Sequence, residues 1–294
     1  MFVLNDLQKL LLFSFLITSM LSIGLRSGVA ELRALIKSRG FMVRALVANF
    51  VFVPLLGFAL ARVFPLAPEA AGALMLLACV PGGLSAIHFT AEVKGQETIA
   101  EALFVVLSLA AVLVSPWVVR FVIPATAELD FPHGRALTFF AISILVPICA
   151  GVVLHDRSRG LAPKLSKALS WASLVLFVAF EIVTHDIRKD ALRSIGWPAV
   201  AAMVLFVLGS MAIGWLMGGP ERRGRQVLAS VSSMRNAIVC MIIARYSGVG
   251  VSALAPLIAF SLLMVTPNTL FTLANAIWSR KASARDTTPK VTAA

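Results

Sequence analysis

The chain has 294 residues, of which 59% are hydrophobic and 14% are charged, and its mean hydropathy is +0.92. A soluble globular protein carries more charge, so the composition excludes that class and indicates an integral protein of a lipid bilayer. The net charge of +12 does not indicate nucleic-acid binding, because the basic residues lie in the loops between apolar segments. No polar block is large enough for a soluble domain, so we expect one membrane domain over residues 1–294.

Hydropathy predicts an all-α polytopic protein with nine transmembrane helices, each near the ~20 residues that a span requires. In chain order the predicted spans are residues 7–27, 40–63, 68–91, 97–125, 135–155, 165–186, 196–217, 225–247 and 254–279. The tail from about residue 282 to 294 is polar and lacks periodicity, so we expect it to be disordered.

Lysine and arginine are unevenly divided between the two ends of the predicted spans. Seventeen of the 26 lie on one side and eight on the other, and Arg235 lies within a span. Since positively charged loops face the cytoplasm, the C-terminus is predicted to be cytoplasmic and, with nine spans, the N-terminus to lie outside. We expect a plasma membrane, such as the inner membrane of a bacterium.

The predicted span 68–91 is interrupted near its middle by Pro81, Gly82 and Gly83, followed by Ser85. Proline removes a backbone donor and clashes with the preceding turn, and glycine weakens a helix interior. A break in the backbone at membrane depth is tolerated only where protein or a water-filled cavity satisfies its polar groups. We therefore expect this segment to border a cavity, although a simple proline kink remains an alternative.

A second interruption is predicted in the span 225–247, whose centre is unusually polar. Its central residues are Ser232, Ser233, Met234, Arg235 and Asn236. A guanidinium is not deprotonated in proteins, and a fixed charge at bilayer depth is costly unless it is paired or wetted, so it usually marks a functional cavity. The alternative is a structural ion pair within a polar packing patch.

Two interrupted spans in corresponding places of two halves indicate the binding site of a transporter. The spacing predicts a 4+5 arrangement, with a first half over about 7–125 and a second over about 135–279. Two repeated halves would contain equal numbers of spans, so a division into four and five spans indicates that one half lacks a first helix.

At both interruptions the chain resembles the bile acid:sodium symporter family. The matching segments are Ala78–Gly83 with its Pro-Gly-Gly, Lys94-Gly95, Val114–Pro116, Ser233–Asn236, Asn49–Pro54, Ile23–Leu25, and Pro256 with Phe260-Ser261. The resemblance covers nearly the whole chain and implies two inverted repeats, a panel and a core domain, and two broken helices that cross. It also implies transport of organic anions, usually with sodium, by alternating access.

The resemblance does not extend to the sodium ligands of the family. Those positions fall here on Ala86, Ile87, Ala100, Phe104, Val231 and Arg235. Asn49 keeps an amide, and Met234 and Asn236 keep the identities found in the family, whereas a hard cation requires several oxygen ligands. We therefore predict no cofactor and no metal site of the usual kind. The alternative is sodium held by backbone carbonyls with Ser85, Ser232 and Ser233.

Arg235 occupies a position where the family places a sodium ligand, so its guanidinium can supply the positive charge of the ion. A guanidinium grips a carboxylate or sulfonate with two hydrogen bonds, which favours a small organic anion as substrate. Glu101, His88 and Glu181 are candidates for proton coupling or for a counter-charge. Each residue also has a structural explanation. Glu101 could lie at a solvated helix start on the cytoplasmic side, Glu181 could lie at the membrane interface, and His88 could donate to a backbone carbonyl.

The sequence thus favours a secondary transporter of organic anions over a sodium symporter with rearranged ligands. A non-transporting receptor or assembly subunit is the alternative from another class. An intramembrane enzyme is not expected, because the chain lacks a Ser/Lys or paired-Asp arrangement and an HExxH motif. The sequence leaves the oligomeric state open.

Overall fold

The computed structural model describes residues 5–83, 97–122, 141–246 and 254–286. Every regular element in these ranges is a helix, and they contain no strand. The first half of the chain forms α1 (Asp6–Gly24), α2 (Val29–Lys37), α3 (Arg39–Val47), the π-helix η1 (Ala48–Phe52), α4 (Val53–Val63), α5 (Pro68–Cys79) and α7 (Glu97–Val122). The second half forms the π-helix η2 (Ala141–Leu145), α9 (Val146–Arg157), α10 (Ala162–Val183), α11 (His185–Ser194), α12 (Gly196–Met217), α13 (Arg222–Ser233), α14 (Ala237–Tyr246), α15 (Leu254–Leu263) and α16 (Val265–Asp286).

Within the described ranges, five helical segments are long and apolar enough to cross a membrane. They are Asp6–Gly24, Arg39–Val63, Ala162–Val183, Gly196–Met217 and Leu254–Ile277. Each coincides with a span expected from hydropathy, so the all-helical membrane protein is confirmed. The count of nine spans stays a prediction, because the other expected spans contain shorter helices or extend beyond the described ranges.

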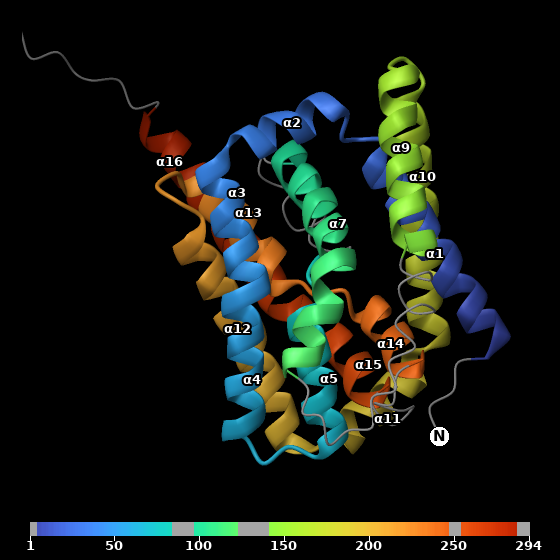
Figure 1. The fold of residues 1–294 in the computed structure, drawn as a ribbon, viewed down its shortest axis with the longest axis vertical. Helices are drawn as coiled ribbons and strands as arrows, with labels where there is room; N and C mark the ends of the chain where they lie inside the picture. The colour runs from blue at the N-terminus through green and yellow to red at the C-terminus, as the bar shows by residue number, and fades with distance from the viewer. Residues whose placement is uncertain (1–4, 84–96, 123–140, 247–253, 287–294) are drawn as a thin grey trace, which may run out of the picture.

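The helices form two outer groups with a middle layer between them (Figure 1). On one side α1 packs along α10 and α9, and on the other α12 packs along α13 and α4. Between the two groups lie α5, α7, α14 and α15 (Figure 1). The largest cluster of buried apolar side chains includes Leu16 of α1, Leu77 of α5, Phe206 of α12 and Phe260 of α15. The middle layer therefore packs against both outer groups.

Two helices, α2 and α11, occur where the sequence analysis expected only loops. Both are short and amphipathic, with charged side chains on one face. A hydropathy average over a bilayer-length window does not detect such helices, because their mean hydropathy is low. Figure 1 shows α2 lying across one end of the bundle.

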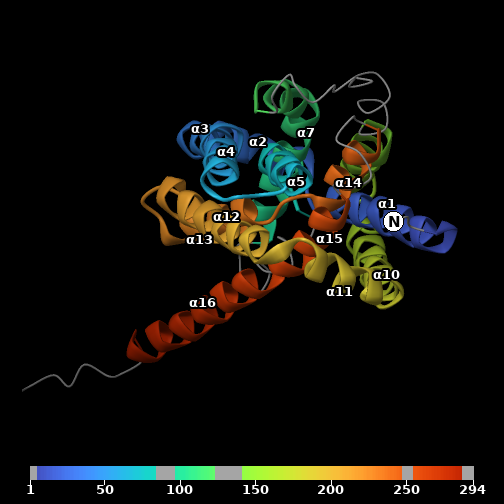
Figure 2. The same cartoon turned by 90° about the horizontal axis from the view of Figure 1, so that it is seen from below.

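The predicted span 254–279 is divided at Met264 into α15 and α16. Pro267 explains the break, because in one continuous helix its ring would clash with the carbonyl of residue 263, whereas proline is tolerated in the first turn of α16. Figure 2 shows α16 projecting away from the other helices. It continues to Asp286, past the position where a disordered tail was expected to begin.

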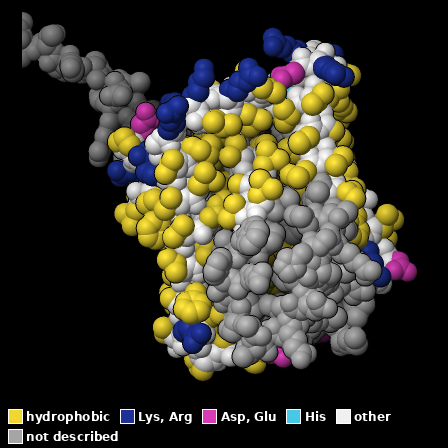
Figure 3. Space-filling model, viewed as in Figure 1, with side chains coloured by type: hydrophobic (Ala, Val, Ile, Leu, Met, Phe, Trp, Pro, Cys, Tyr) yellow, Lys and Arg dark blue, Asp and Glu magenta, His cyan; other side chains and the backbone are white. Residues whose placement is uncertain are grey.

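Among the described residues of the flank seen in Figure 3, hydrophobic side chains predominate, and Lys and Arg gather at the end where α2 and the α9–α10 turn lie. Exposed apolar residues of the long helices include Leu55, Trp171, Val175 and Leu205. An apolar flank with a basic end is the pattern of a helical protein whose sides contact lipid.

Candidate functional site

Two helices end within the bundle, and the chain that follows each is extended. The helix α5 ends at Cys79, and Val80 leaves the helical region with φ −115° and ψ 87°. The helix α13 ends at Ser233, and Met234 is extended before α14 begins at Ala237. Both interruptions predicted from the sequence are therefore present. The second half of the first broken segment lies outside the described ranges.

The two extended segments cross and pair with each other. Pro81 and Arg235 form an isolated antiparallel bridge. The Gly83 N–H donates to the Met234 carbonyl at 3.1 Å, and the Asn236 N–H donates to the Val80 carbonyl at 3.3 Å. These bonds satisfy backbone groups that the broken helices leave without partners, which is the condition for irregular backbone inside a membrane protein.

The crossing explains why two glycines follow the proline. Gly82 has φ +90°, a left-handed conformation that L side chains rarely adopt. A Cβ atom on Gly83 would lie 2.8 Å from the Arg235 carbonyl oxygen and 2.9 Å from the Met234 carbonyl carbon. Only glycine allows the two backbones this approach.

Arg235 is the largest of the completely buried side chains, with 0% of its surface exposed. Its Nη1 donates to the Oδ1 of Asn49 at 3.2 Å. Its Nε and Nη2 are buried and have no hydrogen-bond partner among the described residues, and no salt bridge within those ranges involves it. A buried guanidinium with two unused N–H donors can donate both of them to one anion.

The amide of Asn49 is oriented toward Arg235 by its other bonds. Its Nδ2 donates to the Ala45 carbonyl at 3.0 Å and to the Ser232 Oγ at 3.1 Å, which leaves the Oδ1 to accept from Arg235. Asn49 lies in the π-helix η1, a type of local widening that often occurs at functional sites. Asn49 thus bonds the guanidinium directly, and Ser232 supports it indirectly by accepting a hydrogen bond from Asn49. Both residues were candidates from the sequence.

Asn268 belongs to the same polar cluster and was missed by the sequence analysis. It is completely buried, accepts from the Ser233 Oγ at 2.7 Å and donates its Nδ2 to the Met264 carbonyl at 2.9 Å. An amide in the middle of an apolar span, directly after Pro267, is the signal that would have found it. Ser233 is therefore linked to a third break, the one between α15 and α16.

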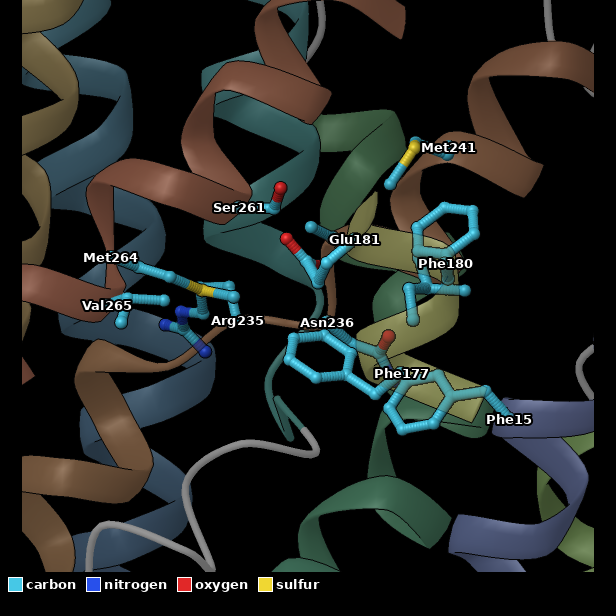
Figure 4. A pocket seen from close by; sticks show the side chains of 12 residues that line it. Phe15, Phe177, Phe180, Glu181, Arg235, Asn236, Met241, Ser261, Met264 and Val265 are labelled. Carbon is cyan, nitrogen blue, oxygen red and sulfur yellow. The ribbon is translucent and has the colours of Figure 1, made fainter. Parts of the chain in front are cut away.

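Arg235 borders a cavity of about 40 Å³. Its polar lining consists of Arg235, Asn236, Glu181 and Ser261. Its larger apolar lining consists of Phe15, Phe177, Phe180, Ala237, Ile238, Met241, Met264 and Val265. Figure 4 shows the three phenylalanines together on one side and Arg235 with Met264 and Val265 on the other. The cavity therefore has a cationic end and an aromatic end.

Of the three titratable candidates, Glu181 alone lines this cavity among the described residues. Glu101 instead accepts from Arg26 at 2.9 Å in a salt bridge. The Nε and Nη2 of Arg26 donate to Ser166 and Ser170 of α10, at 3.0 and 2.6 Å. Glu101 is thus part of a link between α7 and the α1–α10 pair.

This link predicts an asymmetric effect of substitutions on stability. The Glu101 side chain is 5% exposed, whereas that of Arg26 is 32% exposed. Removing the guanidinium from a buried carboxylate costs more than removing the carboxylate from a partly wetted guanidinium. We expect Arg26→Gln to lower the free energy of unfolding by roughly 3 kcal/mol and Glu101→Gln by about 1 kcal/mol. Denaturant unfolding in detergent measures both, and equal costs for the two variants would contradict the expectation.

Ser85 and His88 lie outside the described residues, as do the positions 86 and 87 of the family's sodium ligands. Three other such positions, Ala100, Phe104 and Val231, are completely buried and offer no side-chain oxygen. Alkyl and phenyl side chains give a sodium ion no ligand at these three positions, and the expected lack of a metal site stays a prediction.

Comparison with known proteins gives one family and several distant relatives. The model described as the Sodium Bile acid symporter family matches residues 13–195. Sodium/bile acid cotransporter 4 of Mus musculus is 26% identical over 201 residues, which cover 67% of this chain and 46% of that protein. The Uncharacterized sodium-dependent transporter YocS of Bacillus subtilis (strain 168) is 24% identical over 204 residues, which cover 69% of this chain and 62% of that protein.

A further relative is the Hepatic sodium/bile acid cotransporter of Rattus norvegicus, 26% identical over 175 residues, which cover 58% of this chain and 48% of that protein. The match thus spans from about half to three-fifths of the length of these relatives.

Proposed function

This chain belongs to the Sodium Bile acid symporter family, and from that premise we propose that it is a secondary transporter of organic anions. The family is one of symporters and not of enzymes. The observation that supports an anionic substrate is the completely buried Arg235, whose Nε and Nη2 have no partner among the described residues. These donors border a cavity lined mainly by apolar side chains, so an anion with an organic body matches it at both ends.

In this proposal Arg235 performs the electrostatic task that relatives give to sodium. The guanidinium binds the carboxylate or sulfonate through Nε and Nη2, while Asn49 holds it from the other side through Nη1. Because such a fixed charge needs no ion to be present, binding proceeds without sodium. Asn236, Met234, Ser232, Ser233, Pro81, Gly82 and Gly83 form the surrounding crossing, and Ser85 follows it in the sequence.

Alternating access is proposed to operate through two inverted repeats over nine spans, with the N-terminus outside and the C-terminus in the cytoplasm. The separation of α1, α9 and α10 from the group of α4, α12 and α13 (Figure 1) fits a panel and a core. The cavity lies between such parts, since Phe15 and Phe177 come from α1 and α10 and Arg235 from the crossing. A relative movement of the two parts would then expose the bound anion to either side.

Uptake into proteoliposomes tests the coupling. We expect flux of carboxylates and sulfonates, from acetate to cholate in size, to continue when sodium is replaced by potassium or choline. Protein-free liposomes and Arg235→Gln liposomes are the controls. Strict dependence of uptake on sodium would refute the replacement of the ion by Arg235.

A second candidate is a sodium-coupled symporter with rearranged ligands, favoured by the sodium-dependent relatives and by the serine hydroxyls at the crossing. Ser232 and Ser233 are completely buried beside it. Thermal stabilisation of the purified protein by sodium but not by potassium, lost in Ser232→Ala, would favour this candidate.

A further inference from the structure

We propose that a second cavity, at the basic end of the bundle, binds an anionic phosphate ester, carried either by a lipid headgroup or by a small soluble molecule. This cavity has a volume of about 660 Å³, within the range of small-molecule sites. It shares no lining residue with the cavity beside Arg235. The proposal is therefore independent of the transported substrate.

The walls of this cavity come from four parts of the fold. They are α2, the first two turns of α3, the first turns of α7, and the turn that leads from α12 into α13. Helix α2 packs against α7 and α3 and lies across this end of the bundle (Figure 1). Lys and Arg gather at the same end (Figure 3). A cavity at the basic end of membrane helices lies at the level where lipid headgroups are found.

Three arginines line the cavity, Arg39 and Arg44 from α3 and Arg223 from α13. The Nε of Arg44 is buried and has no hydrogen-bond partner among the described residues, and no salt bridge within those residues involves any of the three. The guanidinium of Arg44 packs against the turn before α13, since a Cβ atom on Gly219 would lie 2.6 Å from its Nη2. A buried donor without a partner is costly, and a guanidinium can donate two hydrogen bonds to one phosphate.

Two glutamates also line the cavity, but they leave an excess of positive charge. The carboxylate of Glu31 lies at the start of its own helix, because a Cβ atom on Gly28 would lie 2.8 Å from its Oε2, and there it complements the positive end of α2. Glu221 is exposed, so water and salt screen its charge. Helices α3 and α13 both begin at the cavity, and neither has a side-chain hydrogen bond at its N-cap. Their first backbone N–H groups add to the attraction for an anion.

The rest of the lining favours a lipid as the source of the phosphate. Leu35, Phe41 and Ile99 line the cavity beside the arginines, and Ile99 is 38% exposed. An acyl chain attached to the phosphate would cover this apolar wall, whereas a soluble phosphate would leave it in water. We therefore expect an anionic phospholipid to bind more tightly than a soluble ester with the same headgroup.

Titration with two lipids that differ in the headgroup tests the proposal. Dioleoylphosphatidylglycerol is anionic, and dioleoylphosphatidylcholine has the same acyl chains and no net charge. The protein, purified in neutral detergent and phosphate-free buffer, is titrated with each lipid and separately with glycerol 1-phosphate, and native mass spectrometry counts the bound molecules. We expect phosphatidylglycerol to bind saturably and about tenfold more tightly than phosphatidylcholine. If glycerol 1-phosphate binds as tightly as the anionic lipid, the source is a soluble phosphate.

Matched arginine variants locate the site. Arg44→Gln is expected to weaken phosphatidylglycerol binding about tenfold. Arg33→Gln should leave it unchanged, because Arg33 is exposed on α2 and is not part of the lining. Melting temperatures without ligand show whether each variant folds, and Arg223→Gln, at an exposed position, provides the same test if Arg44→Gln does not fold. Arg235→Gln should keep full affinity for the lipid.

Three results would overturn the proposal. The first is equal affinity for the two lipids together with no binding of glycerol 1-phosphate. The second is an effect of Arg33→Gln as large as that of Arg44→Gln or Arg223→Gln, since the attraction would then come from the charge of the whole basic end. The third is loss of lipid binding in Arg235→Gln, which would place the phosphate in the other cavity. The proposed transport function does not depend on any of these results.

Discussion

Arg235→Met is expected to raise the melting temperature of the protein while it abolishes the binding of organic anions. Arg235 is completely buried, makes one hydrogen bond to Asn49 and leaves Nε and Nη2 without partners among the described residues. Each buried donor without a partner costs about 1–3 kcal/mol, and an unbranched apolar side chain of similar length removes these costs together with that of the buried charge. The anion loses its fork of donors, which we expect to weaken binding about 100-fold or more.

The opposite signs of the two effects distinguish a binding residue from a structural one. If the role of Arg235 were to hold the helices together through Asn49, then Arg235→Met would lower the melting temperature. Arg235→Lys is the matched control, because it keeps the charge and loses the two-donor geometry. We expect Arg235→Lys to bind anions more weakly than the wild type but more tightly than Arg235→Met. Thermal unfolding in detergent and anion titration of the same preparations give both measurements.

The sequence predicted well those features that depend on composition over a bilayer-length window or on a few neighbouring residues. The predicted span 196–217 coincides with α12, and 7–27 overlaps α1 except at its last turn. Both are uninterrupted apolar runs, for which the cost of an unpaired backbone in lipid leaves a helix as the only choice. The breaks at Pro81 and at Arg235 were likewise predicted, since the side chains that disfavour a helix lie at the breaks themselves.

What the sequence did not predict depends on partners that are distant along the chain. Arg235 and Asn49 are separated by 186 residues, and the resemblance suggested the place of Asn49 but not that its amide oxygen meets the guanidinium. The pairing of Glu101 with Arg26 arises in the same way, where α7 meets the α1–α10 pair. The aromatic side of the cavity arises from the packing of α1 along α10. Hydropathy measures how apolar each segment is, but it does not tell which helix faces pack against each other.

Gly83→Ala is expected to distort the crossing and to lower both stability and anion binding. The added Cβ would lie 2.8 Å from the Arg235 carbonyl oxygen and 3.0 Å from the Arg235 nitrogen. Both are backbone atoms, so no side chain can rotate away, and one extended segment must shift against the other. The shift weakens the bond from the Gly83 N–H to the Met234 carbonyl. We expect the free energy of unfolding to fall by about 3 kcal/mol, from overpacking and the lost bond together.

Gly160→Ala is the matched control, because a Cβ at Gly160 meets nothing within 4 Å and its φ is not positive. The same chemical change there should leave the melting temperature unchanged or slightly raised, through the lower entropy of the unfolded chain. Because Arg235 lies on the segment that must shift, Gly83→Ala should also weaken anion binding, by about tenfold, in preparations that remain folded. A Gly83→Ala protein with the stability and affinity of Gly160→Ala would mean that the two segments do not approach each other this closely, and the guanidinium would then lose the backbone that holds it at the cavity.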